Sequence, residues 1–362
     1  MADLVVAGAG MAGLAAAARA RELGARVVVL EKGDRPGGSA RLSSCVLWRH
    51  RDLAAFREEC PGGDPALQAR VVEELDDALD WLEALGAPVA ERETGNPQTI
   101  GRRFDPNGLV ATLAERAGDV RLGEPLASLP RGVPTILATG GVQGDRALVR
   151  RHVTPEADAL HLRANPWSAG DGLRLALAAG AATSTGLGEF YGRAMPDTPE
   201  PAPSADWVRL AQLYAHVAEV VGADGERYPR EAVRWHEADV VQWIARQPRA
   251  RALYRVPRAA LGARIRERSV GDLVEAARAA GAAVADAGDV VEVPVVAAIT
   301  TTLGGVRVDR DGRALDAAGA PVPGLFAAGT DAGGVFTGGY ASGLAAALVL
   351  GRAAAEAALA SP

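Results

Sequence analysis

Two short apolar runs, separated by an alanine-rich stretch, open the chain. Residues 4–7 and 26–30 are rich in branched apolar side chains and have the length of buried strands. Between them, residues 13–23 have the spacing and alanine content of a helix, and Gly24 marks its end. This order of elements predicts a β-α-β unit at the N-terminus.

Similar patterns recur farther along the chain, but one long segment differs from the rest. The expected helices lie at residues 65–85, 109–117, 172–179 and 344–359, and the expected strands at 133–139 and 325–328. Asp171 is placed to cap the third of these helices. Between residues 188 and 294 the periodicity is less regular, and arginines and prolines are frequent. We therefore predict an α/β fold in which one domain, residues 1–186 and 299–362, is interrupted by an inserted α+β cap domain at residues 187–298.

Composition narrows the classes of function. The 362 residues are enough for two or three domains, and 48% hydrophobic with 23% charged residues excludes a disordered chain. A formal net charge of -6 gives no electrostatic reason to bind nucleic acid or an anionic membrane. Cys45 and Cys60 are too few for a disulfide framework, and no stretch has the length and uniform apolarity of a membrane span. We expect a cytoplasmic protein.

A glycine motif follows the first predicted strand. Residues 8–13 read Gly-Ala-Gly-Met-Ala-Gly, and the predicted helix follows directly. In such a turn Gly8 permits the tight bend, Gly10 lets the backbone approach a pyrophosphate, and Gly13 allows close packing of helix and strand. The helix N-terminus adds unpaired N–H groups. Glu31, at the end of the second strand, is placed to bind the adenosine ribose. The motif predicts a dinucleotide site.

Three more glycine segments favour FAD over NAD. They are residues 36–39, which follow Glu31 closely, residues 138–141 after a predicted strand, and residues 325–334. Each could be an ordinary turn, but a nicotinamide domain has no need of all three. No histidine lies in the loop from Gly37 to Ser44, so we expect the FAD to be held non-covalently. The expected contacts are Gly8, Gly10, Met11, Ala12, Gly13, Glu31, Lys32, Gly38, Ser39, Ala40, Ser43, Ser44, Ala138, Thr139, Gly140, Asp171, Gly329, Thr330, Asp331, Gly343, Leu344 and Ala345.

With these motifs in order, the chain resembles the fumarate reductase and 3-ketosteroid dehydrogenase flavoprotein superfamily. The matching segments are residues 8–13 with Glu31, 37–44, 138–141, 170–172, 225–228, 302–305 and 323–329. The resemblance implies a Rossmann-like FAD-binding domain of the glutathione-reductase type, interrupted by a mobile cap, with the substrate held between them against the flavin. It covers the whole chain.

The departures from the superfamily pattern bear on the substrate. Dicarboxylate reductases of this group carry histidine before the threonine and glycine pair, where this chain has Thr300 and Thr301. They also carry an arginine in the C-terminal glycine loop, where Tyr340 stands here. Without that bidentate partner for a carboxylate, fumarate and succinate are disfavoured as substrates. Thr330 also replaces the usual acidic residue, with Asp331 next, which leaves the contact to the ribityl chain open.

The segment Tyr340-Ala341-Ser342-Gly343 resembles the Tyr-x-Ser-Gly of Δ4-type ketosteroid dehydrogenases. The resemblance implies that the two hydroxyls lie over the flavin, with Tyr340 polarising a ketone and Ser342 relaying the neighbouring proton. The alternative is that both side chains only pack within a glycine loop. Tyr191 is a further candidate facing the substrate, with a buried structural tyrosine as the alternative.

We therefore expect an FAD-dependent oxidoreductase that acts on a CH–CH bond next to a carbonyl, in the dehydrogenation or the enone-reduction direction. The substrate would be an apolar ketone or enone, and the external electron acceptor is unknown. An oxidase of an amine or alcohol is one alternative, and a non-catalytic flavin-binding subunit is another. The sequence does not identify the substrate, direction, electron partner or oligomeric state.

Overall fold

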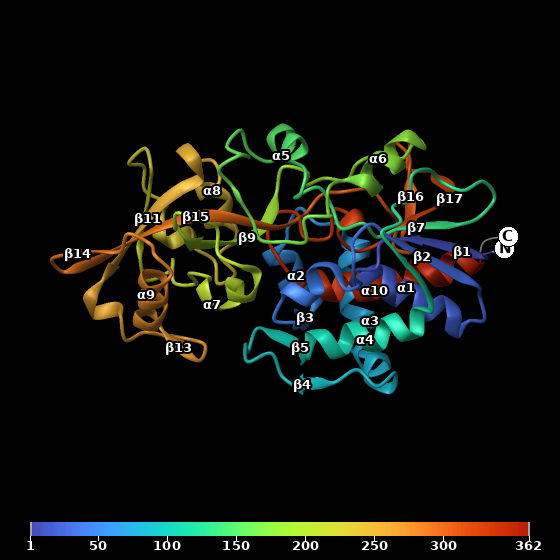
Figure 1. Ribbon diagram of the computed structural model, residues 1–362, viewed down its shortest axis with the longest axis horizontal. Coiled ribbons are helices and arrows are strands. Elements are labelled where there is room, and N and C mark those ends of the chain that lie inside the picture. The colour runs from blue at the N-terminus through green and yellow to red at the C-terminus, as the bar shows by residue number, and fades with distance from the viewer. Residues whose placement is uncertain (1, 361–362) are drawn as a thin grey trace. The chain divides into compact units, whose positions relative to one another are not determined.

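The computed structural model describes residues 2–360, which form two compact units (Figure 1). The first unit comprises the described residues up to Asp145, Asn165–Glu189 and those from Thr302 onward. The second comprises Arg146–Ala164 and Phe190–Thr301. Residues 146–164, which sequence analysis left in the first domain, therefore belong to the second unit. They do so because Val149, Val153 and Leu160 are buried in its core.

A six-stranded sheet forms the centre of the first unit. Its order is β16-β17-β7-β1-β2-β6, with five parallel strands and β16 antiparallel at one edge. The strands are β1 (Leu4–Ala7), β2 (Val27–Glu31), β6 (Asp119–Leu122), β7 (Thr135–Leu137), β16 (Arg313–Leu315) and β17 (Pro321–Ala327). Residues more than 300 positions apart, in β1 and β17, thus flank β7 on either side. The predicted N-terminal β-α-β unit is present.

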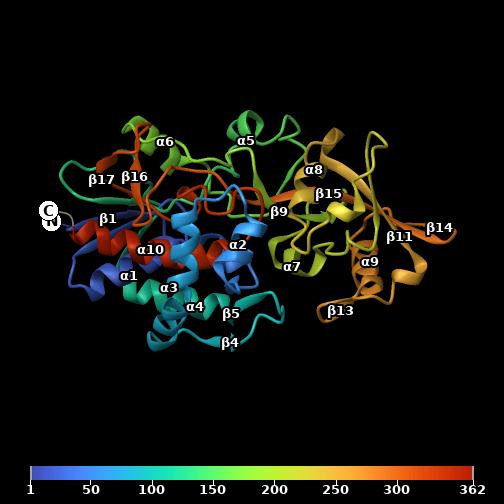
Figure 2. The same cartoon turned by 180° about the vertical axis from the view of Figure 1, so that it is seen from behind.

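Helices α1 (Met11–Glu22) and α10 (Gly343–Ala360) pack side by side in this unit, as both views show (Figures 1 and 2). Their approach is close because the contact is made by small residues: a Cβ on Gly351 would lie 2.5 Å from the carbonyl oxygen of Ala12. The remaining elements of the unit are α2 (Leu53–Glu59), α3 (Pro65–Ala84), α4 (Pro106–Ala117), α6 (Asp171–Ala178), the 3₁₀ turns η1 (Gly38–Leu42) and η6 (Gly329–Asp331), and a sheet ordered β3 (Val46–His50), β5 (Thr99–Phe104), β4 (Val89–Glu91).

Local chemistry explains where these helices begin. Asp64 caps α3 by accepting hydrogen bonds from the N–H groups of Ala66 and Leu67, and Asp105 caps α4. Proline follows each cap at the first helical position, where its fixed φ suits the helix. For α6 the predicted cap was wrong: Gly170, with φ +83°, is the N-cap, and Asp171 is the first helical residue.

By length and composition, α10 is a helix that could cross a membrane. In the structure, 67% of its apolar window is buried. It packs against α1, α3 and β3, so its apolar surface belongs to the core of the first unit.

The second unit is built on a mixed sheet around the long strand β15 (Val290–Thr302). The sheet runs β10 (Glu219–Gly222), β11 (Arg251–Pro257), β15, β14 (Ala285–Ala287), and β8 (His161–Leu162) and β9 (Phe190–Pro196) also pair with β15. The other elements are α5 (Arg146–His152), α7 (Trp207–Leu210), α8 (Ala238–Ile244), α9 (Val270–Ala279), the hairpin β12 (Arg264–Ile265) and β13 (Arg268–Ser269), and the 3₁₀ turns η2 (Ser204–Asp206), η3 (Arg230–Ala232), η4 (Pro248–Ala250) and η5 (Arg258–Ala260). Tyr214 and Tyr254 are fully buried in its core, with ring centroids 5.5 Å apart.

Candidate cofactor site

The glycine turn between β1 and α1 is shaped by close backbone contacts. Gly8 has φ +103°, and a Cβ there would lie 2.2 Å from the carbonyl oxygen of Ala138. A Cβ on Gly13 would lie 1.9 Å from the carbonyl oxygen of Gly8. No atom lies within 4 Å of the position of a Cβ on Gly10. The first and third glycines are therefore required by the fold itself, whereas the open space at Gly10 fits a pyrophosphate approaching the helix N-terminus.

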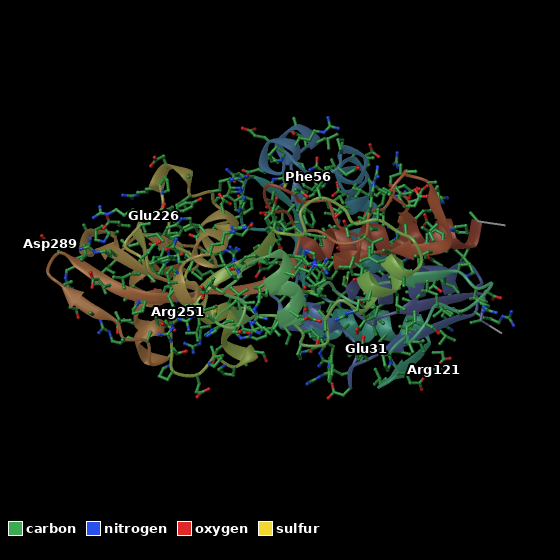
Figure 3. The ribbon with its side chains drawn as sticks, turned by 90° about the horizontal axis from the view of Figure 1, so that it is seen from above. Glu31, Phe56, Arg121, Glu226, Arg251 and Asp289 are labelled. Carbon is green, nitrogen blue, oxygen red and sulfur yellow. The ribbon has the colours of Figure 1, made fainter. Side chains whose placement is uncertain are left out.

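Glu31 lies at the end of β2, beside this turn (Figure 3). Its side chain is held in place by the backbone: Oε2 accepts a hydrogen bond from the Ala9 N–H and Oε1 accepts one from the Gly33 N–H, both at 2.7 Å. Each carboxylate oxygen keeps a second lone pair, so the anchored group can still accept bonds from ribose hydroxyls.

The loop that follows β2 lies against the glycine turn. The Gly37 N–H donates to the carbonyl oxygen of Ala9 at 2.7 Å, and a Cβ on Gly38 would lie 3.3 Å from the Cα of Gly10. The Ser39 hydroxyl accepts a hydrogen bond from the Asn165 N–H at 3.1 Å. Ser43 donates to the Ala40 carbonyl at 2.8 Å, and Ser44 follows it in the same loop. The structure thus brings together two of the segments selected from the sequence, and their contacts to FAD remain predictions.

Asp331 connects the glycine segment at residues 325–334, to which it belongs, with the segment at residues 138–141. Its carboxylate accepts hydrogen bonds from the backbone N–H and the hydroxyl of Thr139, at 2.5 and 2.8 Å, and from the Gly141 N–H at 3.3 Å. Burial raises the pKa of this carboxyl, although the hydrogen bonds act in the opposite direction. The Thr139 hydroxyl also accepts a bond from the Gly172 N–H. Asp331 therefore connects the ends of β7 and β17, and Thr139 connects them to the start of α6.

Two further predicted residues, Lys32 and Asp171, form an ion pair. The Lys32 Nζ and Asp171 Oδ2 atoms are 2.8 Å apart, and both side chains are partly exposed. The pair links the end of β2 to the first turn of α6. Lys32 follows Glu31 directly in sequence, and because its charge is paired with that of Asp171, the pair adds no net charge to the site.

Tyr340 lies in the loop before α10, among aromatic side chains. Its ring centroid is 6.1 Å from that of Trp48, in an edge-to-face arrangement, and 6.0 Å from that of Phe336. Phe56 (Figure 3) stacks on Phe336 in turn. Such ring pairs position each other without polar contacts. These pairs place Tyr340 among aromatic side chains.

Ser342 serves as the N-cap of α10. Its hydroxyl donates to the Val46 carbonyl at 3.2 Å and accepts from the Ala345 N–H at 3.3 Å. The side chain is buried, and the bonds orient the first turn, which contains Gly343, Leu344 and Ala345. Its role as a proton relay stays a prediction, and any relay would have to compete with the cap.

Tyr191 lies in the second unit, on β9, with the Arg193 guanidinium 4.8 Å from its ring centroid. Thr300 accepts a hydrogen bond from Arg163 at 3.1 Å in the same unit. The structure does not relate Tyr191 to Tyr340, and its catalytic role stays a prediction.

Sequence reasoning missed one segment of the site, Asn165 to Ala169, which leads into Gly170. It connects three predicted elements: Asn165 bonds Ser39, a Cβ on Gly140 would lie 2.5 Å from the Ser168 hydroxyl, and the Gly170 N–H donates to the Gly141 carbonyl. The Asn-Pro before the Gly-Asp-Gly motif was the available signal of an ordered turn.

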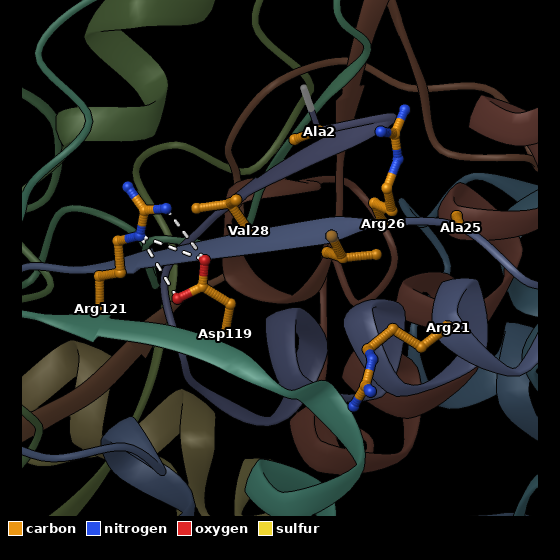
Figure 4. A pocket seen from close by; sticks show the side chains of 8 residues that line it. Ala2, Arg21, Ala25, Arg26, Val28, Asp119 and Arg121 are labelled. Atoms are coloured by element: carbon orange, nitrogen blue, oxygen red, sulfur yellow. Dashed lines mark hydrogen bonds and ion pairs between the residues drawn. The ribbon is translucent and has the colours of Figure 1, made fainter.

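A separate depression of about 550 Å³ lies at the opposite, N-terminal ends of the strands (Figure 4). Its lining includes Arg21, Arg26 and Arg121. Arg26 is paired with Asp3, Arg121 with Asp119, and Arg21 with a backbone carbonyl. The guanidinium beside Asp3 holds the pKa of that carboxyl well below its usual range. Because these cations already have partners within the chain, we assign no ligand to this depression.

Comparison with known proteins adds to this geometry. A family model described as "FAD binding domain" matches residues 3–124 and 131–345. Among curated proteins, a fumarate reductase (cytochrome) from Shewanella frigidimarina is 27% identical over an alignment 229 residues long, and the match covers 50% of this chain and 40% of that protein. The chain therefore spans less than half the length of this relative.

Solved structures show the same fold. A 3-ketosteroid Δ1-dehydrogenase from Sterolibacterium denitrificans superposes with a TM-score of 0.76 at 16% identity, covering 99% of both chains. A 3-ketosteroid Δ4-(5α)-dehydrogenase from Rhodococcus jostii RHA1 gives a TM-score of 0.73 at 19% identity, covering 99% of this chain and 97% of that one. At these identities the likeness concerns the fold alone.

Proposed function

Because the chain belongs to the FAD-binding domain family, with FAD as its cofactor, we propose that it is an oxidoreductase acting on a CH–CH bond next to a carbonyl. In the dehydrogenation direction a proton leaves the carbon next to the carbonyl and a hydride leaves the next carbon. When bound, FAD supplies the two-electron acceptor that this chemistry needs, and in the reverse direction the donor.

One observation carries the choice of substrate class. The loop before α10 presents Tyr340, flanked by the rings of Trp48 and Phe336. A phenol among aromatic rings suits an apolar ketone, to which it can donate one hydrogen bond. A dicarboxylate would need a cationic, bidentate partner at this position, and tyrosine cannot provide one.

Separate residues of the chain would bind the substrate, assist the chemistry and hold the cofactor. The Tyr340 hydroxyl would donate to the substrate carbonyl and so acidify the neighbouring C–H bond. Ser342 would help relay the proton that leaves the carbon next to the carbonyl, and the N-terminus of α10 that it caps would stabilise negative charge at that end of the helix. The glycine turn, Glu31 and the loop from Gly37 to Ser44 would hold the cofactor non-covalently. Tyr191 would be a second hydroxyl toward the substrate.

The proposal extends to the protein's surroundings. We infer a small apolar ketone or enone as substrate, an external electron acceptor, no nucleic acid partner, and a cytoplasmic protein without a membrane span. Cys45 and Cys60 are both buried and are not joined in a disulfide. Burial raises the pKa of the Cys45 thiol to about 12, which disfavours the thiolate form that acts as a nucleophile.

An anaerobic titration of the flavin-loaded protein tests the proposal. Saturated and α,β-unsaturated ketones, including 3-ketosteroids, are added in turn with succinate as the contrasting dicarboxylate, and flavin absorbance is followed. We expect a saturated ketone to bleach the flavin. Bleaching by succinate alone would overturn the assignment of Tyr340. Bleaching only by amines or alcohols, with rapid reoxidation by oxygen, would identify an oxidase instead.

A further inference from the structure

An exposed tryptophan lies beside the ribose-binding carboxylate. Trp167 is 44% exposed, although tryptophan carries a large apolar surface. A Cβ on Gly33 would lie 2.7 Å from Cδ1 of the Trp167 indole and 3.0 Å from Oε1 of Glu31. The indole of Trp167 and the carboxylate of Glu31 therefore both lie close to Gly33. Because glycine has no Cβ, the indole can occupy this space.

The backbone around Trp167 is anchored. Its N–H donates to the Asn165 side-chain oxygen at 3.1 Å, and its carbonyl accepts from the Ala169 N–H at 2.9 Å. Asn165 in turn donates its N–H to Ser39, and Ser168 accepts from Gly144. An exposed aromatic ring on an ordered turn loses little conformational freedom when a ligand contacts it.

We propose that Trp167 forms one wall of the adenine subsite and packs its indole against the adenine ring of FAD. The acidic residue at the end of the second strand binds the adenosine ribose, and the glycosidic bond attaches the adenine directly to that ribose. The base must therefore lie within a few ångströms of Glu31, where the structure places the indole. Adenine has a flat, apolar face, and aromatic side chains bind such faces by stacking.

The inference concerns cofactor affinity and does not depend on the reaction or its substrate. FMN contains the flavin and one phosphate but no adenosine, and ADP contains the adenosine and both phosphates but no flavin. Loss of the indole should therefore weaken FAD and ADP binding and leave FMN binding unchanged. Since stacking of a base on an aromatic side chain is sensitive to alanine substitution, we expect a roughly 5- to 100-fold rise in Kd.

The experiment is isothermal titration of the apoprotein with FAD, ADP and FMN, for wild type, Trp167→Ala and Trp167→Phe. Trp235→Ala is the matched control, because Trp235 is also exposed, at 37%, but lies in the second unit. We expect Trp167→Ala to weaken FAD and ADP binding, Trp167→Phe to weaken both by a smaller factor, and the control to bind all three like wild type. Circular dichroism and thermal melting verify that each apoprotein is folded.

Two results would overturn the proposal. One is unchanged FAD and ADP affinity in both Trp167 variants. The other is an equal loss for FAD and FMN, which would mean that the indole only supports the turn from Asn165 to Gly170. If Trp167→Ala does not fold, the comparison of FAD with FMN in Trp167→Phe decides between the same outcomes.

Discussion

Substitution of Gly10 separates the cofactor's needs from those of the fold. Gly10 has φ −79° and ψ −173°, values that alanine adopts freely, and a Cβ there meets no atom within 4 Å. Gly10→Ala gains about 0.4–1 kcal/mol from the reduced freedom of the unfolded chain. It loses a similar amount because alanine is a poorer N-cap than glycine. We expect the free energy of unfolding of the apoprotein to change by less than about 1 kcal/mol.

The binding of FAD should respond strongly to the same change. The methyl group projects into the open space at the start of α1, where the pyrophosphate would accept hydrogen bonds from backbone N–H groups. Loss of one bond to a charged group costs about 1.5–3 kcal/mol, which is roughly a 10- to 150-fold rise in Kd. Urea unfolding of the apoprotein and titration with FAD measure the two quantities separately.

Two other glycines serve as controls. Gly262→Ala, in the second unit, also meets no atom within 4 Å; it should leave FAD binding unchanged and raise the free energy of unfolding by no more than about 1 kcal/mol. Gly8→Ala should destabilise the apoprotein itself, because its Cβ would overlap the Ala138 carbonyl oxygen. If Gly10→Ala binds FAD as tightly as wild type, the pyrophosphate does not lie at Gly10 and our reading of the turn is refuted.

The remaining predictions concern catalysis, the ribose carboxylate and pH. Tyr340→Phe keeps the ring contacts, so FAD affinity should hold while ketone turnover falls roughly 100-fold or more. Tyr228→Phe, the control, should turn over ketone like wild type. Equal turnover by Tyr340→Phe and wild type would exclude Tyr340 from catalysis. Glu31→Gln retains only one of the two oxygens that accept hydrogen bonds from the Ala9 and Gly33 N–H groups. The free energy of unfolding of the apoprotein, measured with urea, should therefore fall by about 1.5–3 kcal/mol. An unchanged urea midpoint would contradict the role of these hydrogen bonds in stability. Burial lowers the pKa of His161 below 6.5, so on acidification the unfolded chain binds a proton before the folded chain does, and the free energy of unfolding should fall as pH drops below about 6.5. His161→Gln should reduce this pH dependence, measured by urea unfolding at pH 7.5 and 5.5. An unaltered pH dependence would assign it to other groups.

The N-terminal part of the site could be predicted because its signals are local. A strand, a glycine turn and a helix occupy residues 4–22, and every bond that shapes the turn, apart from the contact with Ala138, comes from within the first 38 residues. Gly8, Gly10 and Gly13 have distinct spatial roles, and their spacing alone indicated them. Capping of α3 by Asp64 is equally local.

Other features could not be read from the sequence because they depend on distant partners. In the small sheet, β3 pairs with residues of β5 about fifty positions later, and Trp48 of β3 lies beside Tyr340. Residues 146–164 look like a continuation of the first domain, yet burial of Val149 and Leu160 assigns them to the second unit. The expected contact of Asp331 with the cofactor stays a prediction, but its hydrogen bonds to Thr139 and Gly141, almost two hundred residues away, could not be read from the sequence.

The sequence by itself therefore determined the fold class, the cofactor and the position of the glycine turn, since each rests on short-range spacing of glycines, carboxylates and apolar residues. Only the tertiary structure decided what surrounds Glu31 and Tyr340. Trp167 is more than 130 residues from Glu31, and Trp48 is almost 300 residues from Tyr340. Chain spacing carries no information about such neighbours, because they meet only when the separate segments pack into one core.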